Sequence, residues 1–95
     1  MIGFEWDRQK NEFNIAKHGI GFDEASLIFQ GPILTVIDER NDYGEERKKS
    51  IGAIDGLVII VVVHTDRNGN IRIISARRAN KKEGRLYHDD LKKKT

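Results

Sequence analysis

The sequence predicts an α+β domain in which helices pack on a mostly antiparallel sheet. Runs of β-branched residues, separated by Asp-Gly and Asn-Gly pairs, occupy residues 47–79 and are typical of strands joined by hairpin turns. Polar segments that begin with capping residues lie on both sides of these runs and are typical of helices. The chain is expected to form one domain, residues 1–95.

The chain begins with an expected strand and helix. In residues 2–6, IGFEW, the side chains alternate in the manner of a short strand. The side chain of Asp7 can accept the first free N–H groups of a helix. That helix is expected to end at about His18, because Gly19 readily takes the positive φ of a helix C-terminus.

A second helix and a further strand are expected before the hairpins. Asp23 is the expected N-cap of this helix, apolar residues follow it, and Gly31-Pro32 ends the helix. Residues 33–38, ILTVID, are typical of a strand, and residues 39–46, ERNDYGEE, of a polar loop.

Three strands follow, at residues 47–54, 57–65 and 71–79. Asp55-Gly56 and Asn68-Gly69 are dipeptides typical of two-residue type I′ turns, so each is expected to join two of these strands. The middle strand begins with an unbroken apolar run. It is therefore expected at the centre of the sheet, covered on both faces.

The last helix is expected from Asn80 to about Leu91. Asn80 and Glu83 form the N-x-x-E pattern of a capping box, in which each side chain binds the backbone N–H of the other residue. The predicted order of elements is therefore β-α-α-β-β-β-β-α.

Composition excludes several classes of protein. The chain has no cysteine, so disulfides and thiolate metal ligands are excluded. The longest apolar run, Leu57–Val63, is far shorter than the about 20 residues of a membrane-spanning helix. The first ten residues lack the basic and apolar regions of a signal peptide. We therefore expect a cytoplasmic protein.

Charge is distributed unevenly along the chain. Residues 1–66 contain 7 Lys and Arg against 12 Asp and Glu, a balance of −5, whereas residues 67–95 contain 10 against 3, a balance of +7. A basic surface attracts nucleic acids through their phosphates. Lys92–Lys94 are interpreted as a solvated tail, but Arg72 and Arg77 lie within an expected strand and need another explanation.

The turns suggest a strand register. Two-residue turns would pair Arg47 with His64 and His64 with Ile73. Because side chains alternate between faces, one face would carry Arg47, Lys49, His64, Ser75 and Arg77. The other would carry Lys48, Thr65, Arg72 and Arg78. A bulge near Asp66 would change part of this assignment.

The first of these faces has the groups needed to cleave RNA by attack of its own 2′-hydroxyl on the adjacent phosphate. Arginine binds phosphate oxygens bidentately, histidine exchanges a proton near neutral pH, and lysine stabilises a pentacovalent phosphate. No carboxylate cluster with metal-ligand spacing is visible, so no metal or other cofactor is expected. The candidate catalytic residues are Arg47, Lys49, His64 and Arg77.

Structural roles compete with these assignments. His64 can close the edge of the sheet, and Arg77 can form an ion pair with Glu83 or Glu46. Lys17-His18 can complement the dipole of the first helix. Two aromatic residues also have alternatives: Trp6 fits a core position better than a base-stacking one, and Tyr87 fits either the core or the site.

Several segments resemble a known family. FEWDRQKNEFNIAKHGIGFDEA, EERKKSIG, VVVHTDRNGNIRIISARRA and KKEGRLY stand in the order and spacing of the BrnT toxins of bacterial type II toxin–antitoxin modules. The similarity runs from Phe4 to Tyr87, and the motifs KHG, EER and RIISAR carry most of it. It implies a RelE-like fold, a ribonuclease that arrests translation, and a BrnA antitoxin. In that family the antitoxin has a ribbon-helix-helix DNA-binding domain, and the pair represses its own operon.

The resemblance also implies site residues. The residues that match family motifs are Lys17, His18, Glu46, Arg47, Arg67, Arg72 and Arg77. Of these, Lys17, His18, Arg67 and Arg72, together with Tyr87, are expected to bind substrate. His64 is the candidate general base, with a lysine, a glutamate or electrostatic stabilisation alone as alternatives. A non-catalytic nucleic-acid-binding or protein-interaction module using the same face is the competing function.

Overall fold

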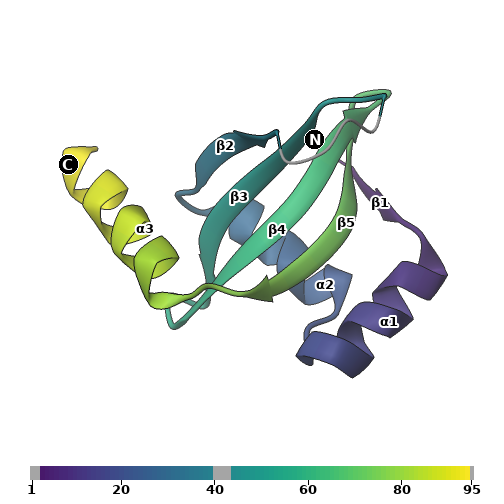
Figure 1. Ribbon diagram of the computed structural model, residues 1–95, viewed down its shortest axis with the longest axis horizontal. Coiled ribbons are helices and arrows are strands. Elements are labelled where there is room, and N and C mark those ends of the chain that lie inside the picture. The colour runs from purple at the N-terminus through teal and green to yellow at the C-terminus, as the bar shows by residue number, and fades with distance from the viewer. Residues whose placement is uncertain (1–2, 40–43, 95) are drawn as a thin grey trace.

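The computed structural model describes residues 3–39 and 44–94, which form a five-stranded sheet with helices on both faces (Figure 1). The elements are β1 (Phe4–Trp6), α1 (Arg8–His18), α2 (Phe22–Ala25), the 3₁₀ helix η1 (Ser26–Gln30), β2 (Leu34–Asp38), β3 (Arg47–Ile54), β4 (Val58–Arg67), β5 (Asn70–Arg78) and α3 (Lys81–Lys93). The strand order is β1-β5-β4-β3-β2, and of these strands β1 and β5 alone pair in parallel. The predicted class and element order are confirmed.

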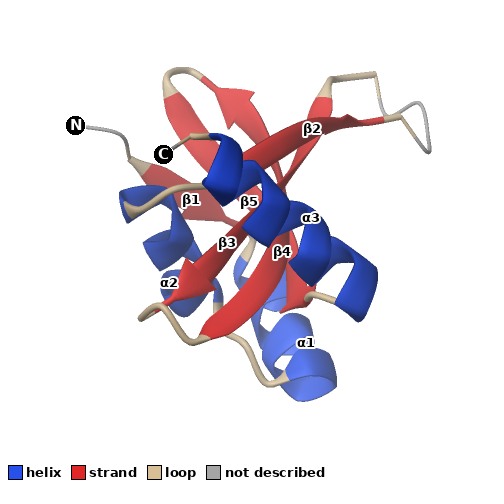
Figure 2. Ribbon diagram, turned by 90° about the vertical axis from the view of Figure 1, so that its left-hand side faces the viewer, coloured by secondary structure: helices blue, strands red, loops and turns tan. Residues whose placement is uncertain are grey.

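The sheet separates two apolar cores. Figure 2 shows α3 in front of the sheet and α1 and α2 behind it. The larger core lies between the sheet and α1, α2 and η1, and includes Phe22, Ile28 and Ile60. The smaller core lies under α3, around Tyr87 and Val61. The predicted central position of the apolar strand is confirmed, because β4 is covered on both faces. Within the described residues, no helix is long and apolar enough to span a membrane.

Most helix ends follow the predicted capping. Asp7 accepts N–H groups at the start of α1, and Gly19 ends that helix with φ 72°. The capping box of α3 is present, and the helix continues to Lys93, two residues beyond the expected end. The predicted cap of the second helix is wrong. Phe22 begins α2, and its N–H donates to the side-chain oxygen of Asn11 in α1 at 2.8 Å. A neighbouring helix therefore provides the acceptor that was expected from Asp23.

The first hairpin differs from the sequence prediction by one residue. Asp55 and Gly56 have the expected positive φ, and the N–H of Leu57 donates to the carbonyl of Ile54. Ile54 nevertheless pairs with Val58, which leaves three residues in the loop. Leu57 is the extra residue and is 85% exposed. Every pair between β3 and β4 is consequently shifted by one position.

The second hairpin has the predicted turn, but a bulge follows it. Arg67 pairs with Asn70 and His64 with Ile73, as expected. The next pair is Val63 with Ser75, so Ile74 is an extra residue in β5. The bulge lies between Val63 and His64, two to three positions before Asp66, near which it was considered. Other strand ends differ slightly: Ile2 lies outside the described residues, and β2, β4 and β5 begin or end one or two residues from their predicted bounds.

Candidate functional site

Three of the candidate catalytic residues, Arg47, Lys49 and Arg77, lie on one face of the sheet, the face partly covered by α3. The register places Lys49, Val63 and Ser75 in one row, and Val61 and Arg77 in the next row. Opposed residues in a sheet share a face, and so do alternate residues of one strand. The shared face therefore carries Arg47, Lys49, Ser75 and Arg77, and is called the basic face below. Lys49 and Ser75 are two strands apart, or about 10 Å.

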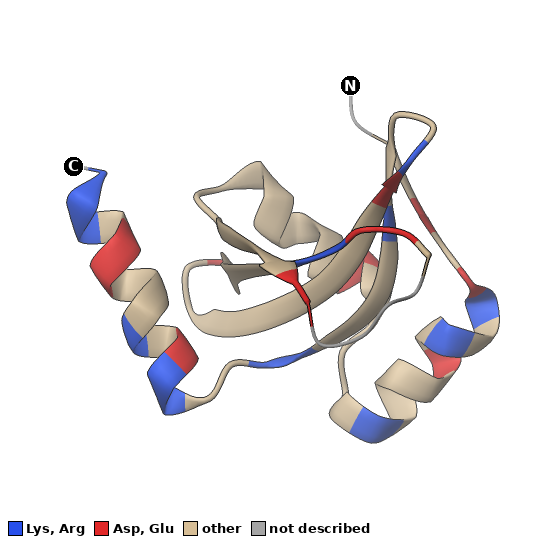
Figure 3. Cartoon of the chain, turned by 45° about the horizontal axis from the view of Figure 1, so that its top comes forward, with Lys and Arg blue, Asp and Glu red and all other residues tan. Residues whose placement is uncertain are grey.

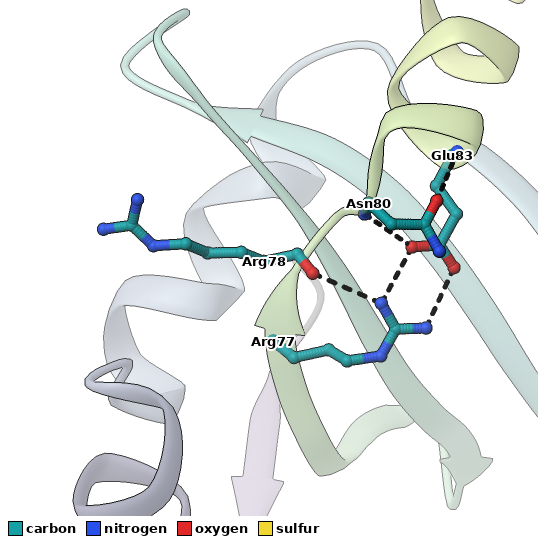
Figure 4. A network of polar contacts seen from close by, with 4 residues as sticks. All are labelled: Arg77, Arg78, Asn80 and Glu83. Carbon is teal, nitrogen blue, oxygen red and sulfur yellow. Dashed lines mark hydrogen bonds and ion pairs between the residues drawn. The ribbon is translucent and has the colours of Figure 1, made fainter.

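Arg77 forms a bidentate ion pair with Glu83 of α3. Its two terminal nitrogens donate to the two carboxylate oxygens of Glu83 at 2.8 and 2.9 Å, and one of them also donates to the carbonyl of Arg78 at 3.2 Å (Figure 4). The same carboxylate accepts the N–H of Asn80 in the capping box. The ion pair considered for Arg77 is thus present, and its partner is Glu83.

This pairing fixes the charge of Glu83. Hydrogen bonding to Arg77 is the main reason why the pKa of Glu83 falls from 4.5 to about 2, and burial opposes that shift. The Asn80 N–H and the positive charges of Arg77 and Lys49 act in the same direction as the hydrogen bond. The carboxylate stays ionised near neutral pH and occupies an anion-binding position on the basic face.

His64 does not lie on the basic face, so its predicted position is wrong. The extra residue Leu57 shifts β3 by one position against β4, and the extra residue Ile74 shifts β5 by one position against β4. Because both neighbours of β4 shift, the cations of β3 and β5 stay on one face, whereas His64 of β4 lies on the opposite face. The imidazole is 3% exposed, packs edge-on against Phe29 and makes a 2.7 Å hydrogen bond to the hydroxyl of Ser50. Within the described part of the chain its Nδ1 has no hydrogen-bond partner.

The environment of His64 favours a neutral ring. Burial is the main reason why its pKa falls from 6.5 to about 4. The nearby carboxylate of Asp66 opposes that shift, and the charge of Lys48 adds to it. A buried, neutral imidazole on the core side of the sheet is out of reach of a substrate on the basic face.

Arg72 and Thr65 were expected on the face opposite Arg77, but this prediction is wrong because the bulge places both on the same face as Arg77. Thr65 shares the face of Val61 and Val63 in β4, and Arg72 is paired with Thr65. Arg72 does have the acidic partner that was expected, because it donates to Glu5 of β1 at 2.8 Å. Lys48 and Arg78 lie on the opposite face from Arg77, as predicted.

Two further candidate substrate contacts are engaged in structural contacts. Arg67 is at the far end of β4, next to the turn, and pairs with Glu45 at 3.4 Å. Tyr87 is 4% exposed in the α3 core, and its hydroxyl donates to the carbonyl of Pro32 at 2.9 Å. Trp6 packs against the larger core with its ring edge-on to Phe22, which confirms the core interpretation.

Lys17 and His18 line a cleft between α1 and β5, next to the basic face. The cleft has a volume of about 610 Å³. Its lining, which defines the α1 cleft, consists of Asp7, Gln9, Lys10, Phe13, Asn14, Lys17, His18, Ile74 and Ser75. Ser75 belongs to both the cleft and the basic face. The sequence prediction missed Lys10 and Phe13, although their spacing to Lys17 places all three on one side of a helix.

Most charged side chains around the α1 cleft and the basic face are Lys or Arg. Figure 3 shows Lys and Arg on α1, at the end of β5 and along α3, with the acidic residues of α3 between them. In residues 3–39 and 44–94, no group of three or more His, Asp or Glu side chains is placed to hold a metal ion.

Comparison with known proteins identifies the family. A family model described as the ribonuclease toxin BrnT of type II toxin–antitoxin systems matches residues 6–83. The chain belongs to the BrnT family. Among solved structures, this BrnT-family chain is similar to the Brucella abortus ribonuclease toxin BrnT, with 27% identity and a TM-score of 0.64. The similarity covers 85% of this chain and all of the Brucella chain. A search of curated proteins found no match.

Family membership confirms the resemblance that the motifs predict, and with it a type II toxin of the ribonuclease class. The matched residues include α1, all of the hairpin strands and the start of α3. They therefore contain the basic face, the α1 cleft and the Arg77–Glu83 pair.

Proposed function

We propose that this BrnT-family chain is an endoribonuclease that cleaves RNA on its basic face without a metal ion. The observation that carries the proposal is the bidentate ion pair between Arg77 and the Glu83 carboxylate. A phosphate offers a guanidinium a similar pair of anionic oxygens. The position that Glu83 occupies beside Arg77 and Lys49 is therefore suited to the scissile phosphate, once the carboxylate has moved aside.

The proposed chemistry is attack of a ribose 2′-hydroxyl on the adjacent phosphate, which forms a 2′,3′-cyclic phosphate and breaks the bond between phosphorus and the 5′-oxygen of the next nucleotide. Water takes the proton of the attacking hydroxyl and supplies one to the leaving 5′-oxygen. Arg77 binds two of the phosphate oxygens, and Arg47 and Lys49 add positive charge where the pentacovalent intermediate accumulates negative charge. His64 has no part in this step because it is buried on the other face. Glu83 has a pKa of about 2, which makes it a weak proton acceptor. Electrostatic stabilisation is thus the main contribution of the protein.

The test compares two neighbouring arginines. Arg77→Ala should slow RNA cleavage about 100-fold or more, which corresponds to about 3 kcal/mol of transition-state stabilisation. Arg77→Lys should recover only part of the loss, because an ammonium cannot make the bidentate contact. Arg78→Ala is the matched control, because the Arg78 side chain points away from the Arg77–Glu83 pair (Figure 4). Full activity of a folded Arg77→Ala protein would refute this role.

The wild-type chain should cleave RNA in the presence of EDTA. The fixed cations of the basic face supply the charge stabilisation for which other nucleases use a metal ion. Cleavage that disappears on chelation and returns with Mg²⁺ would overturn metal independence. Expression in growing cells separates the toxin from a mere binding module, because only a ribonuclease toxin should stop growth and translation and change the RNA population.

We further propose that the partner is a BrnA-like ribbon-helix-helix antitoxin, which covers the basic face and represses the shared operon together with the toxin. A type II toxin requires an antitoxin, and an acidic segment would associate rapidly with a basic surface. A purified complex should be unable to cleave RNA, and Arg47 and Arg77 should be protected from solvent in it. A complex that cleaves RNA at the rate of the toxin alone would contradict this arrangement.

A further inference from the structure

We propose that the α1 cleft is a subsite for one unpaired nucleotide of the RNA, with Phe13 as the stacking platform for its base. This inference rests on the proposed ribonuclease function. It goes beyond that function because it assigns a binding position, a type of contact and a preference for single-stranded RNA.

Phe13 lines the cleft and is exposed to solvent. Its ring is 67% exposed, although removing a phenyl side chain from water is energetically favourable. The ammonium of Lys17 lies 5.9 Å from the ring centroid, at the outer limit of a cation–π contact. Lys10 lies one turn earlier, so the ring has a cation on each side along the helix. An exposed aromatic ring between cations is the arrangement that single-stranded nucleic acids bind, with bases on rings and phosphates on cations.

The cleft is also held in place. The side-chain amide of Asn14 donates to the carbonyl of Ala76 at 2.8 Å and accepts the N–H of Ala76 at 3.1 Å. The same amide donates to the carbonyl of Ile20 at 2.9 Å. Asn14 is 4% exposed. Its amide makes the two hydrogen bonds to Ala76 that the backbone of a neighbouring strand would make, and so joins α1 directly to β5. The two walls of the cleft therefore have a fixed separation.

Charge favours an anionic occupant. Lys10 and Lys17 line the cleft against one carboxylate, Asp7, and the partly exposed His18 adds its ring nitrogens. That carboxylate is already bound to the N–H groups of Gln9 and Lys10 at the start of α1. Gln9 and Ser75 add donors and acceptors that can contact a base or a sugar. A volume of about 610 Å³ lies in the range of sites that enclose one small organic group.

The position of the cleft fits the path of an RNA strand. Ser75 lines the cleft and is two residues from Arg77 on the same face of β5, a separation of about 7 Å. A strand whose scissile phosphate lies at Arg77 would thus reach the cleft with an adjacent nucleotide. The extra residue Ile74 at the bulge contributes an apolar side chain to the floor of the cleft.

The experiment measures binding without cleavage. A fluorescent single-stranded RNA with 2′-O-methyl groups at every position lacks the attacking hydroxyl, so its affinity can be measured by anisotropy with full-length protein. Phe13→Ala should weaken binding about 5- to 150-fold, which corresponds to about 1–3 kcal/mol of base stacking. Phe13→Trp should bind at least as tightly as wild type. Ile15→Ala is the matched control, because Ile15 is 47% exposed on the same helix but does not line the cleft.

Salt dependence separates stacking from charge. Phe13→Ala should weaken binding at every salt concentration and leave the slope of log affinity against log salt unchanged. Lys17→Ala should reduce that slope by about one phosphate contact. Equal binding by Phe13→Ala and wild type would overturn the subsite. So would a Phe13→Ala protein that binds RNA normally but loses affinity for the antitoxin, since the cleft would then be a protein-binding surface.

Failure of the subsite and failure of the ribonuclease proposal have different signatures. If wild type cleaves unmodified RNA and Phe13→Ala binds the methylated RNA normally, only the subsite is wrong. If wild type does not cleave RNA but Phe13→Ala still weakens binding, the subsite stands and the chain is a binding module. Thermal unfolding of each variant checks that the exposed substitutions leave the fold intact.

Discussion

The buried imidazole of His64 should make the protein lose stability as the solution becomes mildly acidic. The native pKa is about 4, and that of the unfolded chain is 6.5. Between these values the unfolded state binds the proton and the native state does not, so the free energy of unfolding falls as the pH falls. Each unit of pH in this window costs about 1.36 kcal/mol. From pH 7.5 to pH 5 the expected loss is therefore about 2 kcal/mol, a large part of the stability of a small domain.

Glu83 contributes little in this interval. The lowered pKa of Glu83 also stabilises the native state, but this contribution is complete above about pH 4.5 and is lost only as the pH falls toward 2. The matched variant is His64→Gln, whose amide can still contact Ser50 but does not titrate. Any cost of the substitution that is independent of pH cancels when each protein is compared with itself at two pH values.

Urea unfolding followed by the fluorescence of Trp6, the single tryptophan, gives the free energy of unfolding at pH 7.5 and pH 5. Wild type should lose about 2 kcal/mol more than His64→Gln between the two conditions. Equal losses in the two proteins would refute the reasoning, because the imidazole would then not be held neutral by its surroundings. At neutral pH, His64→Gln should cleave RNA at the wild-type rate, in contrast to a catalytic histidine.

Three further predictions concern the charged and glycine positions. Arg72→Ala should lower the free energy of unfolding by about 1 kcal/mol through loss of the partly buried Glu5 pair, and the melting temperature by about 4–8 °C, with normal cleavage by the folded protein. Glu83→Gln should bind RNA more tightly than wild type, because it removes the negative charge that competes for Arg77; weaker binding in a filter assay would contradict this. Gly52→Ala should destabilise the protein by about 1–3 kcal/mol in thermal unfolding, because a Cβ there would lie 2.7 Å from a side-chain atom of η1.

The sequence is sufficient to predict the fold because its signals are local and agree with one another. Asp7 and Gly19 mark the limits of one helix, the capping box at Asn80 begins another, and an unbroken apolar run can only be stable between two layers. These features depend on residues close together in the chain, and each is found where it was expected.

The composition of the site was harder to predict because it depends on strand register. One extra residue in a turn, Leu57, and one in a bulge, Ile74, leave no clear trace in the sequence. Each reverses the face on which later residues lie. Arg47 and Lys49 in β3 and Arg77 in β5 are each shifted by one position against β4, so they still share a face. A residue of β4 itself does not share this shift and lies on the other face. The grouping of the cations was thus predicted correctly and the position of the histidine was not.

The parallel pairing of β1 with β5 has a consequence for the order in which the protein folds. Glu5 and Arg72 are 67 residues apart in the chain, and Asn14 and Ala76 are 62 apart. Contacts over such separations form late, because a long loop must close before they contribute stability. β1 is therefore synthesised well before it can reach its final place. The α1 cleft does not exist until β5 has been synthesised, so a nascent chain lacks that site until then.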